Sequence, residues 1–332
     1  MRRVSLAIIA AIAVAAVLLI TGPQRIALAQ DKTGNEALAT QLEKHSEAGF
    51  HNLTAFTLQD GKAIFAGLGS DEHTEVEIGS VTKMFTGELA HQLAEEGKLQ
   101  PDTTVGEVLD VGDAPVADVT VRELLNHTSG LPRLASANLL NSLASGVTGS
   151  NPYEGETVED IMAAATKAEL KNRGEESYSN LGYGLLGHMV ETVAGQPYEQ
   201  MLKERIFEPA GMTETYLMTP GSVPDDAPRG LTPTGRHAEP WEMEGSAPAG
   251  AIRSTANDMA KFAEWFMKNG DTDYGWQPPS EGNVGYWHNG GTYGYSTMLI
   301  VDPGTKRAAF ANNDSLAGTE DLAQALFDEL AS

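Results

Sequence analysis

The chain has 332 residues, of which 41% are hydrophobic, so it is long enough for a large packed core and too apolar to be disordered. It contains no cysteine, which excludes disulfides, thiol catalysis and cysteine-ligated metal sites. Its formal net charge of −24 argues against nucleic acid or an anionic membrane as a partner.

The first residues have the pattern of an export signal. A pair of arginines precedes the apolar run 4–20, and Ala27-Leu28-Ala29 ends a short polar stretch. This pattern predicts a signal peptide over residues 1–29, cleaved after Ala29, and a periplasmic or extracellular location. An uncleaved membrane anchor is the alternative, and membrane contact is expected only in that case. Residues 30–332 then carry a formal charge of −27, because residues 1–29 contain three Arg and no acidic residue.

The N-terminal part of the remaining chain predicts a helix and then a hairpin. An amphipathic helix is expected within residues 30–50, with its inward side chains at Leu38, Leu42 and Ala48. Residues 53–69 alternate in the manner of two strands, and Asp60-Gly61 is a typical two-residue hairpin turn.

A strong helical pattern follows over residues 81–96. Phe85, Leu89 and Leu93 recur at four-residue spacing, and Gly97 is suited to a left-handed helix end. The segment Ser80-Val81-Thr82-Lys83 therefore lies at the start of this helix.

Helices and loops alternate through the middle of the chain. Thr120, with Glu123 three residues later, forms a capping-box pattern. Further helices are expected at 157–168, 181–194 and 198–207, and loops at 135–157 and 218–248.

The C-terminal part predicts one more capped helix and then strands. Residues 254–258 begin a helix, 284–288, 295–301 and 307–312 read as antiparallel strands, and 318–330 as a final helix. We therefore expect an α+β fold in which one antiparallel sheet combines N- and C-terminal segments. The expected sheet lobe covers about 40–80 and 250–332, and the inserted helical lobe covers about 81–249, within a single domain 30–332.

Three short segments carry candidate chemistry. Lys83 follows Ser80 by three residues, so both side chains lie on one helix face and an amine can take the serine proton. Tyr178 lies before a helix, and a cation such as Lys83 would lower the pKa of its phenol. The run 288–292 offers a histidine and glycines that allow a ligand to approach sheet backbone. Standing alone, each segment has an ordinary structural explanation, and S-x-x-K arises by chance about once in such a chain.

Together these segments resemble a known family. The order Ser80-Val81-Thr82-Lys83, Tyr178-Ser179-Asn180 and His288-Asn289-Gly290 is similar to the serine β-lactamase-like superfamily. The resemblance covers about residues 40–330, and it points to the branch with class C β-lactamases, D-Ala-D-Ala carboxypeptidases and related esterases. It implies the β-lactamase/transpeptidase-like fold and a serine hydrolase that works through an acyl-enzyme.

The resemblance also implies roles by position. Ser80 is the expected nucleophile, and Lys83 and Tyr178 are the expected bases, with Tyr178 also protonating the leaving group. Asn180 is expected to contact the substrate amide and to orient Lys83. The backbone N–H groups of Ser80 and Gly291 are the expected oxyanion hole. No cofactor and no metal are implied, and a monomer is expected.

The third segment departs from the family pattern. Asn289 stands where many relatives have Thr or Ser, whose hydroxyl helps to hold a substrate carboxylate, while Asn289, Gly290 and Gly291 are still expected to line the substrate site. His288 replaces the lysine of class C enzymes. From its reference pKa near 6.5 we predict that activity depends on pH near that value.

Several alternatives stay open at this point. The substrate is a small molecule or a peptidoglycan-type peptide, and the bond is an amide or an ester. A non-catalytic penicillin-binding or sensor protein with the same fold is the main alternative. The chain has no G-x-S-x-G elbow and no H-E-x-x-H motif, which disfavours an α/β-hydrolase and a metallo-hydrolase. Loops 133–157 and 218–248 are the expected specificity elements.

Overall fold

The structure is a computed structural model that describes residues 24–135, 145–146, 148–279 and 284–330. Most of the expected signal peptide, and part of the expected loop 133–157, lie outside these residues. Residues 24–29 lie against the folded chain, with the N–H of Gln24 bonded to the carbonyl of Thr234 and that of Ala29 to His51. No helix in the described part of the chain is long and apolar enough to cross a membrane.

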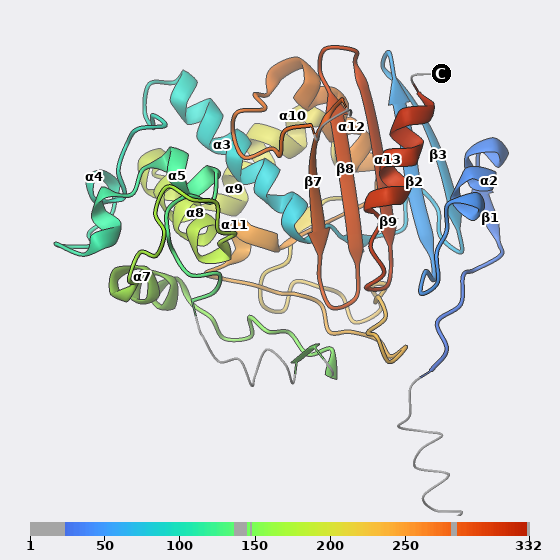
Figure 1. Ribbon diagram of the computed structural model, residues 1–332, viewed down its shortest axis with the longest axis horizontal. Coiled ribbons are helices and arrows are strands. Elements are labelled where there is room, and N and C mark those ends of the chain that lie inside the picture. The colour runs from blue at the N-terminus through green and yellow to red at the C-terminus, as the bar shows by residue number, and fades with distance from the viewer. Residues whose placement is uncertain (1–23, 136–144, 147, 280–283, 331–332) are drawn as a thin grey trace, which may run out of the picture.

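A six-stranded antiparallel sheet forms one half of the molecule, on the right in Figure 1. Its strand order is β1-β3-β2-β9-β8-β7, so N-terminal strands pair directly with C-terminal ones, as the sequence predicts. The strands are β1 (Lys32–Gly34), β2 (Leu53–Gln59), β3 (Lys62–Leu68), β7 (Tyr286–Gly291), β8 (Ser296–Asp302) and β9 (Arg307–Asn313). The hairpin turn between β2 and β3 is confirmed, with positive φ at both Asp60 and Gly61.

Both faces of the central strands are buried, which explains their nearly continuous apolar sequence. Side chains alternate between two hydrophobic clusters, as the two-residue period of a strand requires. Phe56 and Phe310 stack at 5.6 Å in one cluster, while Ala55 and Ala311 face the other. The sheet is therefore the middle layer of a three-layer structure.

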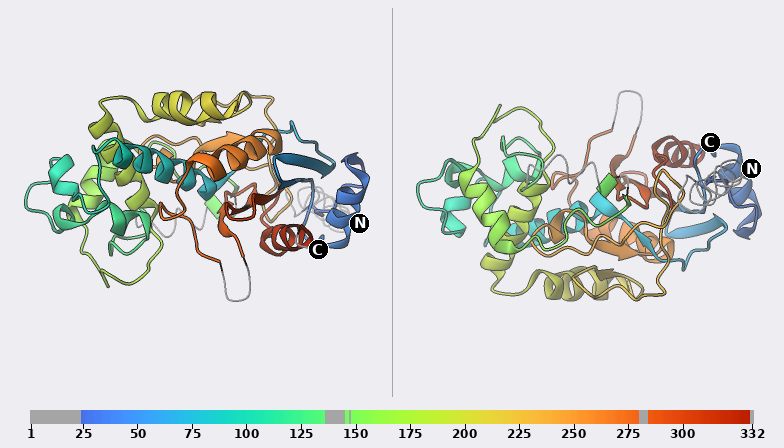
Figure 2. Two further views of the ribbon diagram at one scale, coloured as in Figure 1. Left: turned by 90° about the horizontal axis from the view of Figure 1, so that it is seen from above. Right: turned by 90° about the horizontal axis from the view of Figure 1, so that it is seen from below.

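Helices cover the two faces of this sheet (Figure 2). Helices α2 (Glu36–Lys44) and α13 (Glu320–Glu329) cover one face, and α12 (Ala256–Asn269) covers the other. Leu38 and Leu42 of α2 are buried as predicted. The prediction for Ala48 is wrong, because α2 ends at Lys44 and Ala48 is exposed; Ala39 is buried instead.

A second, three-stranded sheet was not predicted from the sequence. It has the order β4-β6-β5, from β4 (Val76–Glu77), β6 (Ile252–Ser254) and β5 (Tyr216–Leu217). Strands of two or three residues are too short to show a period-two pattern. The fully buried Arg253 of β6 forms an ion pair with Glu75 at 2.9 Å. Strand β6 pairs with β4, and the chain runs from the end of β4 directly to Ser80.

Helices make up the other half of the molecule. Helix α3 (Thr82–Glu95) runs through its centre and is preceded by the 3₁₀ turn η1 (Gly79–Val81). The other helical elements are α4 (Val105–Val108), η2 (Pro115–Asp118), α5 (Val121–Leu125), α7 (Val158–Lys167), α8 (Asn180–Ala194), α9 (Tyr198–Leu202), the π-helical turn η3 (Lys203–Phe207), α10 (Glu208–Ala210) and α11 (Ala247–Gly250). The predicted capping box of Thr120 and Glu123 is present. A Cβ on Gly187 of α8 would lie 2.1 Å from Pro248, so this glycine lets α8 pack closely on α11.

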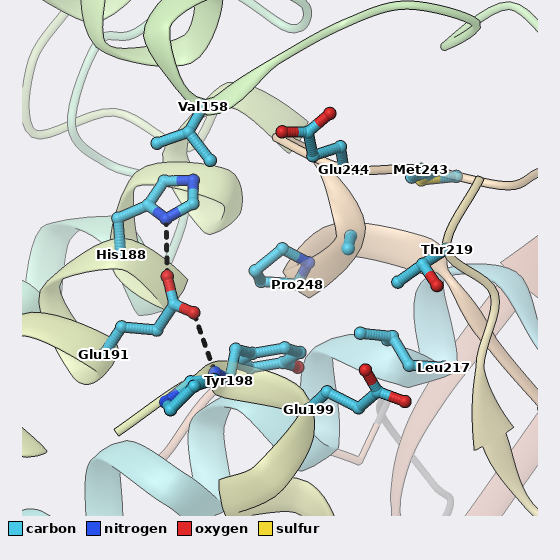
Figure 3. A pocket seen from close by; sticks show the side chains of 12 residues that line it. Val158, His188, Glu191, Tyr198, Glu199, Leu217, Thr219, Met243, Glu244 and Pro248 are labelled. Carbon is cyan, nitrogen blue, oxygen red and sulfur yellow. Dashed lines mark hydrogen bonds and ion pairs between the residues drawn. The ribbon is translucent and has the colours of Figure 1, made fainter. Parts of the chain in front are cut away.

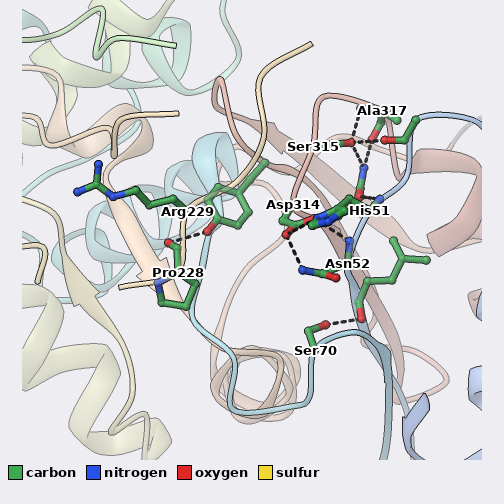
Figure 4. A network of polar contacts seen from close by, with 12 residues as sticks. His51, Asn52, Ser70, Pro228, Arg229, Asp314, Ser315 and Ala317 are labelled. Carbon is green, nitrogen blue, oxygen red and sulfur yellow. Dashed lines mark hydrogen bonds and ion pairs between the residues drawn. The ribbon is translucent and has the colours of Figure 1, made fainter. Parts of the chain in front are cut away.

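A polar network joins the start of β2 to the end of β9 (Figure 4). Both carboxylate oxygens of Asp314 are used: the N–H and the side-chain amide of Asn52 donate to them, and the ring of His51 lies 2.9 Å away. The carbonyl of Asp314 accepts the N–H of Leu231. The expected loop 218–248 is therefore tied to the sheet at this point.

Candidate active site

The three predicted segments meet where η1, α8 and β7 come together. Ser80 lies in η1 at the start of a continuous helical run that ends at Glu95. Tyr178 precedes α8, whose N-cap Ser179 accepts the N–H of Gly182 and donates to the carbonyl of Pro132. Strand β7 passes beside η1, close enough that a Cβ on Gly290 would lie 2.0 Å from the carbonyl oxygen of Ile78.

Ser80 is contacted by two groups that can carry its proton. The Nζ atom of Lys83 lies 3.0 Å from the Oγ atom of Ser80, and the hydroxyl of Tyr178 donates to the same Oγ at 2.6 Å. Both distances are within the range for proton transfer along a hydrogen bond. The structure thus brings together Ser80, Lys83 and Tyr178, from two segments almost one hundred residues apart.

The surroundings of Lys83 favour a neutral amine. Its side chain is fully buried, and burial, aided by the charge of Arg133, lowers its pKa well below the ordinary value. Nζ also contacts the carbonyl oxygen of Ala249 at 2.6 Å and Oδ1 of Asn180 at 2.9 Å. These oxygens can only accept, so Nζ donates to both of them, and an amine in its neutral form would keep its lone pair for the hydroxyl of Ser80.

The state of Tyr178 differs from the sequence prediction. Burial raises the pKa of its phenol to about 12, against the opposing effects of the Ser80 hydrogen bond and the charge of Arg133. Lys83 is not one of the groups that shift this pKa, and burial lowers its own pKa and so disfavours its charged form. Tyr178 is therefore a proton donor at neutral pH, and Lys83 is the group that can accept the proton of Ser80.

Two residues that sequence reasoning missed hold the catalytic groups in place. Tyr153 accepts a hydrogen bond from Nδ2 of Asn180 at 2.9 Å, which turns Oδ1 of Asn180 toward Lys83. The ring of His127 packs against the ring of Tyr178, with centroids 4.3 Å apart and planes tilted by 35°, and its Nδ1 accepts the N–H of Ser179 at 3.1 Å. His127 has a φ of +57°, a backbone conformation that is uncommon for a non-glycine residue. This local conformation is seen in the structure and could not be read from the sequence.

The edge of β7 provides one of the two backbone N–H donors of a candidate oxyanion hole. The N–H and carbonyl of Trp287 both bond to Gln277, on the side away from β8. Because N–H groups of alternate residues in a strand point the same way, those of Asn289 and Gly291 also point away from β8. The N–H of Ser80 lies in the first turn of a helix and has no intrahelical acceptor. A substrate oxygen between Ser80 and Gly291 can accept from both groups.

Comparison with known proteins assigns the family. The Beta-lactamase family model matches residues 35–274, which is most of the chain. The chain belongs to the beta-lactamase family. It is 28% identical to penicillin-binding protein 4 of Amycolatopsis lactamdurans, over 85% of this chain and 82% of that protein. It is 33% identical to a putative D-alanyl-D-alanine carboxypeptidase of Escherichia coli strain K12, over 43% of this chain and 34% of that protein.

Solved structures show the same fold. A β-lactamase/D-alanine carboxypeptidase from Pseudomonas syringae matches with a TM-score of 0.74 and 16% identity, over 89% of this chain and 98% of that one. A class C β-lactamase from Rhodobacter sphaeroides matches with a TM-score of 0.70 and 19% identity, over 90% of this chain and all of that one. The β-lactamase/transpeptidase-like fold predicted from the sequence is confirmed, and the chain is a member of a family of serine hydrolases.

In this family member, His288 is set apart from the reacting groups. It is 2% exposed, its Nδ1 lies 2.6 Å from the carbonyl oxygen of Asn289, and it does not line the cavity at Ser80. Burial lowers its pKa to about 3, so the ring is neutral at physiological pH. The predicted pH dependence near 6.5 therefore has no basis in His288.

A cavity of about 410 Å³ opens in front of Ser80. Asn289, Gly290 and Gly291 line it, as predicted. The remaining lining residues are Tyr178, Arg133, Ser296, Leu316, Gly318 and Glu320. Of the two loops expected to set specificity, 133–157 contributes Arg133, but no residue of 218–248 is among those that line this cavity. Instead, Leu316 and Gly318, which precede α13, and Glu320, at its start, line the cavity.

A second cavity, of about 210 Å³, lies between α8, α9 and α11 (Figure 3). None of the predicted site residues lines it. Polar groups in its wall have hydrogen-bond partners within the protein: Glu191 lies 2.9 Å from Nδ1 of His188 and accepts the N–H of Tyr198 at 2.7 Å. Among the described residues, no three His, Cys, Asp or Glu side chains are grouped as metal ligands.

Proposed function

We propose that the protein is an exported serine hydrolase that cleaves an amide or an ester through an acyl-enzyme on Ser80. One observation carries this proposal: the Oγ atom of Ser80 is approached by a buried amine at 3.0 Å and by a phenol at 2.6 Å. Such an arrangement offers a base and an acid at one nucleophile, which is the minimal set for acyl transfer.

In the proposed acylation step, Lys83 takes the proton of Ser80 as Oγ attacks the substrate carbonyl. The N–H groups of Ser80 and Gly291 stabilise the negative charge on the carbonyl oxygen. The C–N or C–O bond then breaks, and Tyr178 gives its proton to the leaving group. The proton held by Lys83 returns to the Tyr178 phenolate, so both groups are reset for the second step.

In the proposed deacylation step, a water molecule enters the space of the departed leaving group. Neutral Lys83 takes a proton of this water through the hydroxyl of Tyr178, which passes its own proton to Lys83 as it receives one from the water, and the water oxygen attacks the acyl carbon within the same oxyanion hole. The ester bond to Ser80 breaks, and Oγ regains a proton. Asn180 and Tyr153 keep Lys83 aligned in both steps, which makes them positioning residues in this scheme.

A fluorescent penicillin and p-nitrophenyl acetate, each given to wild type and to Ser80→Ala, test the proposal. We expect ester turnover by wild type, with mass spectrometry detecting an acyl adduct on Ser80, and neither result with Ser80→Ala. Stoichiometric labelling by penicillin without turnover of any amide or ester would support a penicillin-binding or sensor protein instead. If wild type neither turns over nor is labelled, the hydrolase proposal is wrong.

Export is part of the proposal and rests on residues 1–29 alone. The arginine pair, the apolar run 4–20 and the small residues at Ala27 and Ala29 support it. Expression of the full chain in a bacterium, followed by fractionation and N-terminal sequencing, tests it. A mature protein that begins at Gln30 outside the cytoplasm is the expected result. A full-length protein in the membrane fraction would favour the anchor.

A further inference from the structure

One wall of the cavity carries a fixed negative charge. Glu320 lines the cavity together with Ser80 and Gly291, and its Oε1 accepts the side-chain amide of Asn289 at 2.7 Å. Asn289 is the residue at which the third motif departs from the pattern that holds a substrate carboxylate. The structure therefore places a carboxylate of the protein beside that position.

The surroundings of Glu320 hold this carboxylate in place. It is the first residue of α13, where the N-terminal end of the helix dipole favours a negative charge. A Cβ on Gly318 would lie 2.3 Å from Oε2 of Glu320, so the lack of a side chain at Gly318 leaves room for the carboxylate. No lysine or arginine among the described residues forms an ion pair with Glu320, and its charge is not neutralised in this way.

The positive group of the cavity lies elsewhere. The Arg133 guanidinium lies over the ring of Tyr178, 5.0 Å from its centroid, and its side chain is exposed. It makes no ion pair with Glu320 in the described part of the chain. Arg133 is exposed and Glu320 is half-buried, so water screens the charge of the arginine more than that of the carboxylate beside Asn289.

We propose that Asn289 and Glu320 make the cavity select acyl compounds whose leaving group carries a cationic amine, and disfavour leaving groups that carry a carboxylate. This inference rests on the proposed hydrolase function and names its substrate class. Glu320 attracts an ammonium group and repels a carboxylate at the same position. Both effects therefore raise the ratio of kcat/KM for the amine-bearing substrate to kcat/KM for the carboxylate-bearing one.

Three aryl acetates that differ in one meta substituent test the proposal: 3-(aminomethyl)phenyl, 3-(hydroxymethyl)phenyl and 3-carboxyphenyl acetate. The value of kcat/KM is measured for each ester with wild type, Glu320→Gln and Asp321→Asn. Asp321 is the matched control, because it is exposed, lies in the same helix turn and does not line the cavity. Intrinsic differences between the esters cancel in the ratio of variant to wild type.

We expect Glu320→Gln to lower kcat/KM for the aminomethyl ester about five- to tenfold and to raise it for the carboxy ester by a similar factor. The neutral ester and the Asp321→Asn variant should change less than about twofold on the same reasoning. A wild type that prefers the carboxy ester, or a Glu320→Gln variant that changes all three esters equally, would overturn the proposal. So would an Asp321→Asn variant that reproduces the pattern, because the effect would then come from the overall charge.

A binding measurement separates this proposal from the proposed function. Calorimetry measures the affinity of 3-hydroxybenzylamine and 3-hydroxybenzoate for Ser80→Ala protein, with and without Glu320→Gln. If the amine binds more tightly than the benzoate, and Glu320→Gln abolishes that difference, the cavity preference is supported even if no ester is turned over. Equal binding of the two compounds overturns the preference, and ester turnover that depends on Ser80 would then leave the hydrolase proposal standing.

Discussion

The hydroxyl of Tyr178 donates a hydrogen bond of 2.6 Å to Oγ of Ser80, while burial raises the pKa of Tyr178 to about 12. A phenol in this state is an acid that is ready to protonate a leaving group, and it is not a resting base. The amine of Lys83, whose pKa is lowered by burial, contacts the same oxygen. The two roles are thus divided between a buried amine and a buried phenol.

Removal of the Tyr178 hydroxyl should have an effect that depends on the leaving group. We expect Tyr178→Phe to lower kcat/KM about 10²- to 10³-fold for an alkyl ester or an amide, which need protonation of the leaving group. The loss should be about tenfold or less for p-nitrophenyl acetate, whose leaving group is already a stable anion. Tyr286→Phe is the control, since Tyr286 belongs to β7 and is not among the residues that line the cavity. Equal losses for both substrate types would contradict the acid role.

The pH profile of activity should follow Lys83 and not His288. Burial lowers both pKa values, and that of His288 to about 3. Because the neutral amine is the proposed base, kcat/KM should fall as pH drops through the lowered pKa of Lys83. His288→Gln should keep the position of that inflection, as measured by kcat/KM from pH 5 to 10. An inflection that disappears in His288→Gln would restore the histidine to the mechanism.

Two neighbouring glycines of β7 should respond differently to the same substitution. A Cβ on Gly290 would lie 2.0 Å from the Ile78 carbonyl oxygen and 3.0 Å from the N atom of Ser80. A Cβ on Gly291 would meet nothing nearer than the Tyr295 carbonyl oxygen at 3.8 Å. We expect Gly290→Ala to lower kcat about 10²-fold or more by moving β7 away from Ser80, and Gly291→Ala to retain most activity.

Circular dichroism of the two variants checks that the fold is kept. Thermal melts should show Gly291→Ala close to wild type, while Gly290→Ala loses some stability as β7 shifts. Gly290→Ala with full activity would show that the close approach of β7 to η1 is not needed for the reaction.

Lys83 should make the stability of the protein depend on pH. Its pKa is lowered in the folded state, so below the unfolded value of about 10.4 the unfolded chain binds a proton that the folded chain does not. This favours unfolding, and the effect fades as pH rises toward 10.4. Relative to Lys83→Met, the wild type should gain up to about 1.4 kcal/mol per pH unit as the pH rises from the lowered pKa of Lys83 in the folded protein toward the unfolded value.

Urea unfolding at several pH values measures this difference. Lys62→Met, which removes an exposed lysine, is the matched control and should show no such slope relative to wild type. A difference between wild type and Lys83→Met that stays constant with pH would mean that Lys83 is charged in the folded protein.

The sequence by itself determined the order and type of the main elements, because long apolar periods and turn residues are local signals. The hairpin at Asp60-Gly61, the helix after Ser80 and the last two C-terminal strands are present as predicted, whereas the first of the three lies at Tyr286–Gly291 and not at 284–288. The motifs at Ser80 and Tyr178 were also readable, since each lies just before a helix, whereas Asn289 lies inside β7 and was readable only from the residues of its own motif. The short strands β4 and β5 were not, because two residues carry no period.

Only the tertiary structure decided the protonation states and the substrate wall. Burial is a property of the packed chain, and it lowers the pKa of Lys83, keeps Tyr178 protonated and removes His288 from titration near neutral pH. The contact of Asn289 with Glu320 joins residues 31 positions apart through the packing of α13 on β8 and β9, which brings its first residue to β7. No local pattern encodes such a contact, since it depends on where two separate elements meet in space.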